Sequence, residues 1–358
     1  MKRTNYIEIN KKKIGNLQEV YVVAEMSGNH NGKIETALEI IKTAKECGAD
    51  AIKIQTYTAE TITINHDSPE FKINGGLWDG RNLYDLYNEA HTPWEWHEEM
   101  FDFAKKIGIT IFSSPFDETS VDFLEKLNTP AYKIASPELI DLNLIKKVAS
   151  TGKPVILSTG MANKNEIQNA VQAVRDQGNN QIVVLHCTSA YPTPVNESNL
   201  KTISEISNQF NVLSGLSDHT IGTKIATYAS LLGGCFIEKH FTLDRQKGGV
   251  DSAFSIEPIE LKNLVKDLKE LKLIMGKVAF SPTDSEKNVL KTRRSLYVVK
   301  DISKGDFLTR ENIKSIRPGK GLNPKFLDIA LNSIASRNLK FGEPLSRDMF
   351  IEKSDKKR

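Results

Sequence analysis

The sequence contains little cysteine, with three residues among 358, at Cys47, Cys187 and Cys235. Because these are odd in number, scattered and set among apolar residues, they exclude a disulfide framework and fit a reducing compartment such as the cytoplasm. Long apolar runs are also missing, since none approaches the roughly 18 residues that a membrane-spanning helix needs, and the basic start of the chain lacks the apolar core of a signal peptide. We therefore expect a cytoplasmic protein that has no membrane partner.

An excess of one charge is absent as well. The 48 lysines and arginines are matched by 45 aspartates and glutamates, which leaves a formal net charge of +3. The lysines are spread among acidic residues and form no basic stripe, so the sequence does not predict nucleic-acid binding. Small molecules are the expected partners.

The strongest pattern is an alternation of short β-branched runs with amphipathic, helix-like stretches, which occurs eight times. Continuous apolar strands separated by helices imply a parallel sheet that is buried on both faces. We expect an α/β fold with a closed (β/α)8 TIM barrel. A doubly wound open sheet is the alternative, although no GxGxxG motif follows the first strand. The expected strands are residues 21–26, 51–55, 109–114, 131–136, 154–159, 182–187, 212–217 and 236–241.

The long stretch from Thr58 to about His91 interrupts this alternation after the second strand. It contains three glycines and several large aromatic residues, among them Trp78. A long loop at the carboxyl end of a barrel strand is usually a lid or a binding loop. A surface excursion packed on its own aromatic residues explains the composition equally well, and both interpretations stay open.

The pattern changes after Gly276. Residues 277–292 are polar and are interpreted as a linker between a barrel domain, residues 1–276, and a small β-rich domain, residues 293–358. The small domain contains an internal repeat, which predicts a compact pseudo-symmetric module whose core is marginal in isolation. The repeated positions are Asp301-Ile302, Gly305, Leu308, Arg310 and Ile313 in the first half, and Asn338-Leu339, Gly342, Leu345, Arg347 and Phe350 in the second.

Two histidines close to the ends of neighbouring strands are the first candidates for chemistry. His219 follows the seventh strand and His240 lies in the eighth. In a barrel the carboxyl ends of the strands share one mouth, so the two imidazoles are expected to converge and to bind a divalent cation. Imidazole and oxygen ligands permit manganese, iron or zinc. His30, after the first strand, is either a third ligand or a brace for its loop.

Cationic and hydroxyl side chains at other strand ends predict an anion site. Lys53 and Lys133 each lie inside an otherwise apolar strand, and burying a lysine there is costly unless it is paired or binds a ligand. Phosphate and carboxylate groups suit such lysines together with hydroxyl donors. Lys239 is instead expected to form a salt bridge with its neighbour Glu238. The hydroxyls that could assist the two lysines are those of Ser136, Ser158 and Ser217.

Two rival functions remain open from these residues. The lysines at the strand ends could form a Schiff base, as in an aldolase. Alternatively, the protein could be a non-catalytic sugar-binding protein whose small terminal domain binds the ligand.

Several motifs resemble the sialic acid synthase family, specifically its pseudaminic acid synthase branch, along nearly the whole chain. Met26-Ser27, Pro137 and Ser189 depart from the neuraminate branch of that family and fit a different sugar. The matching motifs are AEMSGNHNG (24–32), KIQTYTAET (53–61), TPWEWH (92–97), FSSPFD (112–117), YKIAS (132–136), ILSTGMA (156–162), HCTSAYPTP (186–194), GLSDHT (215–220), IEKHFTLDR (237–245), GGVDSAFSIEP (248–258), RRSLYVV (293–299) and IRPG (316–319).

The resemblance implies a metal-dependent enzyme that condenses phosphoenolpyruvate with an acetamido hexose and releases phosphate. For this branch the acceptor is 2,4-diacetamido-2,4,6-trideoxy-β-L-altropyranose and the product is pseudaminate. A manno-configured acceptor, as used by N-acetylneuraminate or legionaminate synthases, is the alternative. The resemblance places Mn2+, or alternatively Mg2+ or Co2+, on His219 and His240, and catalytic roles on Glu25 and Glu138. Its substrate contacts are Lys53, Gln55, Lys133, Ser136, Ser158, Ser189, Tyr191, Ser217, Asp251 and Arg317.

The resemblance also implies how the small domain is used. It is similar to the antifreeze-like (SAF) domain of these synthases, which is exchanged between the subunits of a homodimer. In the family this domain delivers an arginine, here Arg317, over the partner's barrel mouth.

Overall fold

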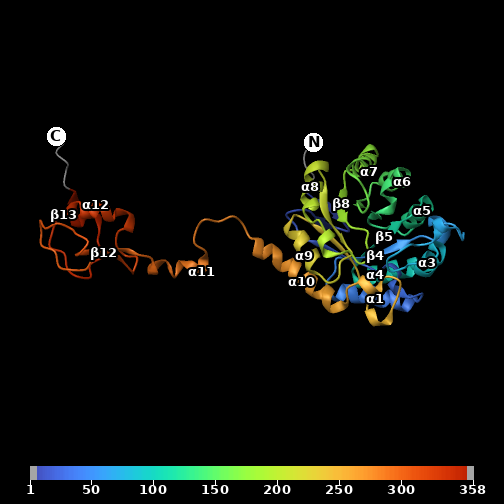
Figure 1. The fold of residues 1–358 in the computed structure, drawn as a ribbon, viewed down its shortest axis with the longest axis horizontal. Helices are drawn as coiled ribbons and strands as arrows, with labels where there is room; N and C mark the ends of the chain where they lie inside the picture. Colours follow the sequence, from blue (N-terminus) through green and yellow to red (C-terminus); the bar gives the residue numbers. More distant parts are fainter. Residues whose placement is uncertain (1–5, 353–358) are drawn as a thin grey trace. The chain divides into compact units, whose positions relative to one another are not determined.

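A computed structural model describes residues 6–352 and divides the chain into two compact units. Unit 1 extends to Gly276, and unit 2 begins at Lys277. Unit 1 contains the strands and helices of the repeated pattern, and unit 2 is smaller and rich in short strands (Figure 1).

Within residues 6–352, unit 1 contains a closed barrel of eight parallel strands, which confirms the TIM barrel and excludes the doubly wound sheet. The strand order around the barrel follows the chain, with β10 closing against β3. The strands are β3 (Tyr21–Glu25), β4 (Ala51–Thr56), β5 (Thr110–Pro115), β6 (Tyr132–Ile134), β7 (Val155–Ser158), β8 (Ile182–Cys187), β9 (Leu213–Asp218) and β10 (Phe236–His240).

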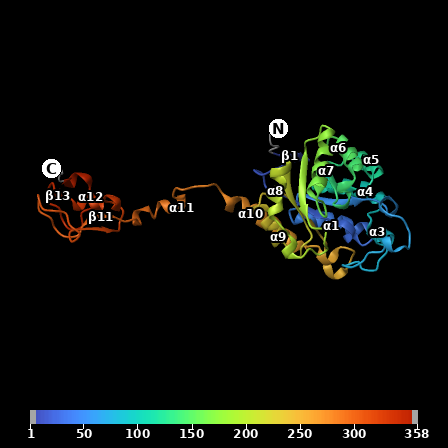
Figure 2. The same ribbon diagram turned by 45° about the horizontal axis from the view of Figure 1, so that its top comes forward.

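Amphipathic helices surround the strands and bury their apolar faces on the outside of the barrel (Figure 2). Several helices begin at a residue whose side chain accepts backbone N–H bonds, as Asp117, Asp141 and Asn163 do. The helices that follow the barrel strands are α1 (Ile34–Glu46), α4 (His97–Ile107), α5 (Glu118–Lys126), α6 (Leu142–Ser150), α7 (Lys164–Asp176), α8 (Lys201–Phe210), α9 (Lys224–Leu231) and α10 (Pro258–Met275).

A short hairpin that the sequence analysis missed fills the amino end of the barrel. Strands β1 (Ile7–Ile9) and β2 (Lys12–Ile14) pair antiparallel through a two-residue loop in which both residues have positive φ. Ile7, Ile9 and Ile14 are buried in one cluster with inward-facing barrel residues. The hairpin therefore closes the end of the barrel opposite the mouth.

The barrel interior changes from apolar to charged along the strands. Ala51 and Phe236 belong to the apolar cluster beneath, whereas Lys53 and Glu238, two residues further along the same strands, are buried polar groups. Because alternate residues of a strand point to the same face, each strand contributes to both layers. The charged layer lies at the carboxyl end, where the mouth opens.

The long loop after β4 folds into α2 (Ala59–Ile62), a turn-rich excursion, and α3 (Leu83–Ala90). Gly75, Gly76 and Gly80 have φ near +80°, which the turns between Ile73 and Arg81 require. The indole Nε1 of Trp78 donates to the carbonyl of Val250, 3.0 Å away, in the loop after β10. The loop therefore contacts the barrel mouth, as expected for a lid or binding loop.

Unit 2 consists of two halves that pair reciprocally, which confirms the internal repeat. The N–H of Gly305 donates to the carbonyl of Ala335, and the N–H of Gly342 donates to that of Val298, both at 2.8 Å. Ile302 and Leu339 exchange N–H···O bonds of 2.9 and 2.8 Å. The elements are α11 (Asp284–Lys287), β11 (Ser295–Val298), β12 (Ile313–Ile316), α12 (Leu327–Leu331), β13 (Ser333–Ala335) and β14 (Phe350–Glu352).

No helix in the described part of the chain combines the length and apolar character that crossing a membrane requires. The three cysteines are free and buried.

Candidate active site

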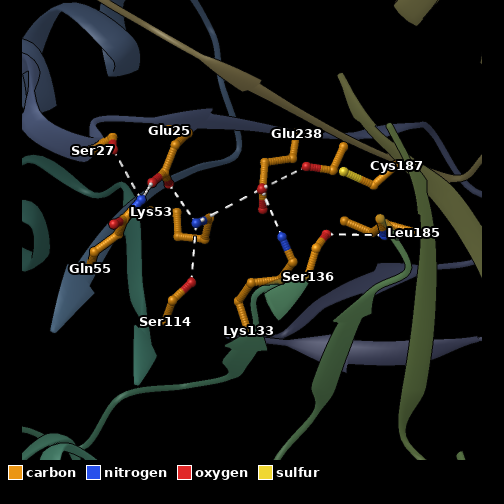
Figure 3. A network of polar contacts seen from close by, with 12 residues as sticks. Glu25, Ser27, Lys53, Gln55, Ser114, Lys133, Ser136, Leu185, Cys187 and Glu238 are labelled. Atoms are coloured by element: carbon orange, nitrogen blue, oxygen red, sulfur yellow. Dashed lines mark hydrogen bonds and ion pairs between the residues drawn. The ribbon is translucent and has the colours of Figure 1, made fainter. Parts of the chain in front are cut away.

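Four charged side chains meet inside the carboxyl end of the barrel (Figure 3). Lys53 Nζ lies 2.7 Å from Glu25 Oε2 and 3.8 Å from Glu238 Oε1, and Lys133 Nζ lies 2.8 Å from the same Glu238 oxygen. These side chains are between 1% and 4% exposed. They come from β3, β4, β6 and β10, so the barrel brings together residues that are far apart in the sequence.

Burial and mutual charge shift the proton affinities in this cluster. Burial raises the pKa of Glu25, and the ammonium group of Lys53 offsets this effect only in part. Burial opposes ionisation of Glu238 too, but there the ammonium groups of Lys133 and Lys53 dominate and lower the pKa. A higher pKa of Glu25 weakens the negative charge that opposes the two lysines, and so makes the cluster more positive. A buried positive charge of this kind favours an anionic ligand.

Hydroxyl groups line the site beside the lysines. The Ser217 hydroxyl donates to Glu238 Oε1 at 3.2 Å, and the Ser136 hydroxyl accepts the N–H of Gly160 at 3.1 Å. A Cβ at Gly160 would lie 2.0 Å from the hydroxyl of Ser189, so glycine is required for this close approach. The Ser158 hydroxyl is buried and has no hydrogen-bond partner within the described chain. An unsatisfied buried hydroxyl suits a ligand that supplies the missing bond.

The two histidines converge as expected. The rings of His219 and His240 have centroids 5.2 Å apart and meet at 61°. His219 Nδ1 lies 3.0 Å from the carbonyl of Thr188, and donation to that carbonyl leaves Nε2 with a free lone pair. His240 Nδ1 is buried, has no hydrogen-bond partner among the described residues, and lies 3.8 Å from Asp251 Oδ2. Two imidazoles with available lone pairs are suitable ligands for a divalent cation.

Three further residues of the expected site lie around this centre. Gln55 donates to Glu25 Oε1 at 2.8 Å and to the hydroxyl of Ser27 at 3.0 Å. Burial raises the pKa of Asp251, although a hydrogen bond from the side chain of Ser27 acts to lower it. The ring of Tyr191 lies 4.3 Å from that of His219, centroid to centroid.

Glu138 lies in the short turn after β6 and is largely withdrawn from water. Its Oε2 is buried without a hydrogen-bond partner among residues 6–352. Burial raises its pKa to about 7. A carboxyl group with a pKa near neutrality can exchange a proton readily, as a general base or acid must.

The common partner of the two lysines was not predicted, and one expected pairing was wrong. Glu238 is the common partner of both lysines, and its place two residues before His240 was the available signal. The expected salt bridge between Lys239 and Glu238 does not form. Lys239 points to the opposite face of β10, where Nζ lies 2.8 Å from Asp218 Oδ2.

His30 braces its loop and is not brought into the histidine pair. Its Nδ1 accepts the N–H of Gly32 at 3.1 Å, and its Nε2 lies 3.4 Å from the hydroxyl of Thr92. Both ring nitrogens are therefore engaged, which favours the structural interpretation. Within residues 6–352 no group of three or more histidine, cysteine, aspartate or glutamate side chains is arranged to hold a metal ion.

Arg317 belongs to unit 2, where it is exposed and follows β12. Unit 2 is described by itself, so the structure does not bring Arg317 together with the barrel residues. Its expected role stays a prediction.

Comparisons with known proteins agree with this architecture. The model of the NeuB family matches residues 40–279, and that of the SAF domain matches residues 293–351. The chain is 44% identical to pseudaminic acid synthase of Campylobacter jejuni over 343 residues, covering 94% of this chain and 99% of that protein. It is 45% identical to pseudaminic acid synthase of Helicobacter pylori over 335 residues, covering 93% and 98%.

More distant similarities concern other acetamido sugars. N,N'-diacetyllegionaminic acid synthase of Campylobacter jejuni is 36% identical, covering 91% of this chain and 99% of that protein. Among solved structures, the N-acetylneuraminic acid synthetase of Leptospira borgpetersenii is similar, with a TM-score of 0.71 and 30% identity. That match covers 80% of this chain and 95% of the other.

Proposed function

Since the chain belongs to the NeuB family, we propose that it is a pseudaminic acid synthase. It condenses phosphoenolpyruvate with 2,4-diacetamido-2,4,6-trideoxy-β-L-altropyranose and releases pseudaminate and phosphate. The observation that supports this most strongly is the buried Lys53–Lys133–Glu238 cluster, which combines anion-binding groups with a histidine pair at one barrel mouth. The higher identity to pseudaminate synthases than to the legionaminate enzyme favours this acceptor over a manno-configured one.

The two lysines bind phosphoenolpyruvate through its carboxylate and phosphate. Both ammonium groups already contact Glu238, so the anion enters a site whose positive charge is held in place before it arrives. The Ser158 hydroxyl, which has no partner in the described chain, gains one from the ligand. Ser136, Ser189 and Ser217 supply further directed donors. Pre-positioned charge of this kind stabilises a transition state without reorganisation.

A divalent ion fits between His219 and His240, because each ring presents a nitrogen without a hydrogen-bond partner in the described chain. Asp251, 3.8 Å from His240 Nδ1, provides nearby negative charge. When bound, such an ion supplies Lewis-acid polarisation of the sugar's aldehyde carbonyl. We propose Mn2+, with Mg2+ and Co2+ as alternatives.

The residues then perform two tasks. The lysines and serines hold phosphoenolpyruvate so that its C3 faces C1 of the open-chain sugar. The electrons of its C2=C3 double bond form the new carbon–carbon bond, the aldehyde C=O double bond opens to a hydroxyl that takes up a proton, and C2 becomes electron-deficient. Glu138 accepts a proton from the water that adds to C2, which its pKa of about 7 permits. The new C2 hydroxyl then gives up its proton as the C2–O bond to phosphate breaks, which leaves a ketone at C2 and releases phosphate. Holding both reactants in one cavity removes up to roughly 7–11 kcal/mol of the barrier.

The active form is proposed to be a homodimer in which the SAF domain is exchanged, so that Arg317 of one subunit reaches the mouth of the other. Its exposed guanidinium suits an anionic or hydroxylated ligand. The cytoplasmic location expected from the cysteines stays a prediction.

Phosphate release with a panel of acceptors tests the function. The protein is incubated with phosphoenolpyruvate, Mn2+ and the altro-configured sugar, and in parallel with manno- and legionaminate-type acceptors. Preference for the altro sugar is the expected result. Preference for a manno-configured sugar contradicts the assignment, and borohydride trapping of pyruvate on Lys133, whose pKa burial lowers, favours the aldolase instead.

Metal dependence is tested by chelation. Removing divalent ions is expected to abolish phosphate release, and adding Mn2+ is expected to restore it. His240→Asn should lose both metal content and activity, whereas His66→Asn, which changes an exposed histidine of the long loop, should retain both. Full activity of the metal-stripped wild-type protein would refute the histidine site.

A further inference from the structure

The rim of the mouth carries an aromatic wall, formed by Trp78, Tyr191 and Phe254. The rings of Trp78 and Tyr191 have centroids 5.4 Å apart, and Tyr191 lies 5.2 Å from Phe254. The three come from the loops after β4, β8 and β10. Phe254 is buried at 2% exposure, whereas Trp78 and Tyr191 are half-buried and retain accessible surface.

The wall adjoins the histidine pair. Tyr191 lies between Trp78 and His219, at 4.3 Å from the latter ring, and Phe254 lies 4.9 Å from His240. The wall thus offers a path along which a molecule with its reactive end at the histidines can extend past Tyr191 toward Trp78.

The only polar atom of the Trp78 side chain is already hydrogen-bonded. Its one polar atom, Nε1, donates to the carbonyl of Val250 at 3.0 Å, and this bond also fixes the loop that carries it. The remaining indole surface can pack against a methyl group but offers no partner to a hydroxyl. A hydroxyl placed there loses its hydrogen bonds to water without replacement. Such a surface does not suit the anionic phosphoenolpyruvate either.

We propose that Trp78 determines acceptor specificity by packing against the terminal C6 methyl group of the sugar, and so selects 6-deoxy over 6-hydroxy acceptors. The inference rests on the proposed function, in which C1 of the acceptor is at the histidines and C6 is the opposite end. An apolar contact of this kind rejects an added hydroxyl by about 10- to 100-fold in kcat/KM.

Two acceptors that differ only at C6, methyl or hydroxymethyl, test the inference. The wild-type protein is expected to prefer the 6-deoxy sugar, and Trp78→Ala is expected to reduce that preference to within about threefold. The KM for phosphoenolpyruvate should not change, because within residues 6–352 Trp78 forms no hydrogen bond, cation–π contact or ring contact with the lysine cluster. Trp78→Phe should retain most of the preference. Leu77→Ala, which removes an exposed neighbour in the same excursion, serves as the matched control.

Calorimetric titration of both sugars, in the absence of phosphoenolpyruvate, gives an independent measurement of binding. Equal affinity of the wild-type protein for the two sugars overturns the inference. An equal loss of kcat/KM for both sugars in Trp78→Ala also overturns it, because such a loss indicates that Trp78 has a purely structural role. If neither sugar supports phosphate release by the wild-type protein, the proposed function fails, and the titration alone then decides the role of Trp78.

Discussion

At the scale of single residues, a buried ion pair lies directly behind the two histidines. Asp218 and Lys239 are each 1% exposed and precede His219 and His240 in the sequence. Lys239 Nζ also donates to the carbonyl of Thr220 at 2.5 Å. The pair therefore connects the ends of β9 and β10 on the face opposite the histidines.

Removing one partner of this pair is expected to destabilise the protein strongly. Lys239→Met leaves the Asp218 carboxylate buried without its cation, which typically costs about 3–5 kcal/mol of unfolding free energy. Urea denaturation measures the change. Lys340→Met removes one partner of an exposed pair in unit 2 and should change the stability very little. A loss below about 1 kcal/mol for Lys239→Met as well would contradict the importance of burial.

The pKa of Glu138 predicts how activity depends on pH. A general base must be ionised, so kcat/KM for phosphoenolpyruvate should rise as the pH increases through about 7. In Glu138→Gln the rate should be low and this rise should be absent. If kcat/KM of the variant still rises through the same pH range, a group other than Glu138 is responsible for the pH dependence.

The raised pKa of Glu138 also predicts that the folded protein becomes less stable as the pH rises, although its activity increases. Burial raises the pKa of Glu138 from 4.5 to about 7, so the folded state holds a proton that the unfolded state has lost, and its stability falls as the pH rises between these values. The loss reaches about 3 kcal/mol above pH 7. Glu138→Gln should therefore be more stable than the wild type at pH 8 and equally stable at pH 4. Thermal unfolding at the two pH values measures this.

The sequence revealed the unusual residues of the site but not their partners. Lys53 and Lys133 were recognisable because a charged residue inside an apolar strand is costly without a partner or ligand. The pairing of Glu238 with these lysines was not recognisable, because Glu238 is 105 residues from Lys133 and their contact depends on how the strands are staggered around the barrel. The pairing of Lys239 with Glu238 was wrong because adjacent residues of a strand point to opposite faces.

At the scale of elements, the amino-terminal hairpin makes a testable contribution to the barrel. Ile9 is 0% exposed and packs among inward-facing residues below the charged layer. Ile9→Ala should destabilise the protein by about 2–5 kcal/mol. The KM for phosphoenolpyruvate should stay unchanged, since the hairpin is at the end opposite the mouth. Glu8→Ala, at an exposed position of the same strand, should change the stability by less than about 0.5 kcal/mol.

The eight strands were predicted closely because each is a continuous apolar run between helices. The hairpin was missed because its strands have three residues each, too short for a period of two to be recognised. The two interpretations of the long loop could not be separated from composition. The contact that brings the loop to the mouth joins Trp78 and Val250, which are 172 residues apart and therefore leave no signal in local composition.

At the scale of the whole molecule, the proposed exchange of SAF domains predicts complementation between two inactive variants. Arg317→Ala and Glu138→Gln are co-expressed with different tags, and the mixed dimer is purified. If the domain is exchanged, one barrel of that dimer has both Glu138 and Arg317, and about half of the wild-type activity should return. If each subunit uses its own Arg317, both sites of the mixed dimer stay inactive.

The matched control for this experiment is Arg310→Ala, which changes another exposed arginine of unit 2. It should leave activity unchanged in the homodimer. The sequence predicted two domains from the change in pattern after Gly276. It could not predict how the two domains are arranged, because that depends on surface complementarity rather than on periodicity.

The reciprocal pairing in unit 2 has a consequence for a single repeat made as a separate peptide. Residues near Gly305 donate to the strand of the second half, and those near Gly342 donate to the strand of the first, so each half leaves its backbone groups unsatisfied when alone. Two copies of one half could satisfy them in the same way. For such a peptide, folding and self-association would be a single event, with a melting temperature that rises with concentration.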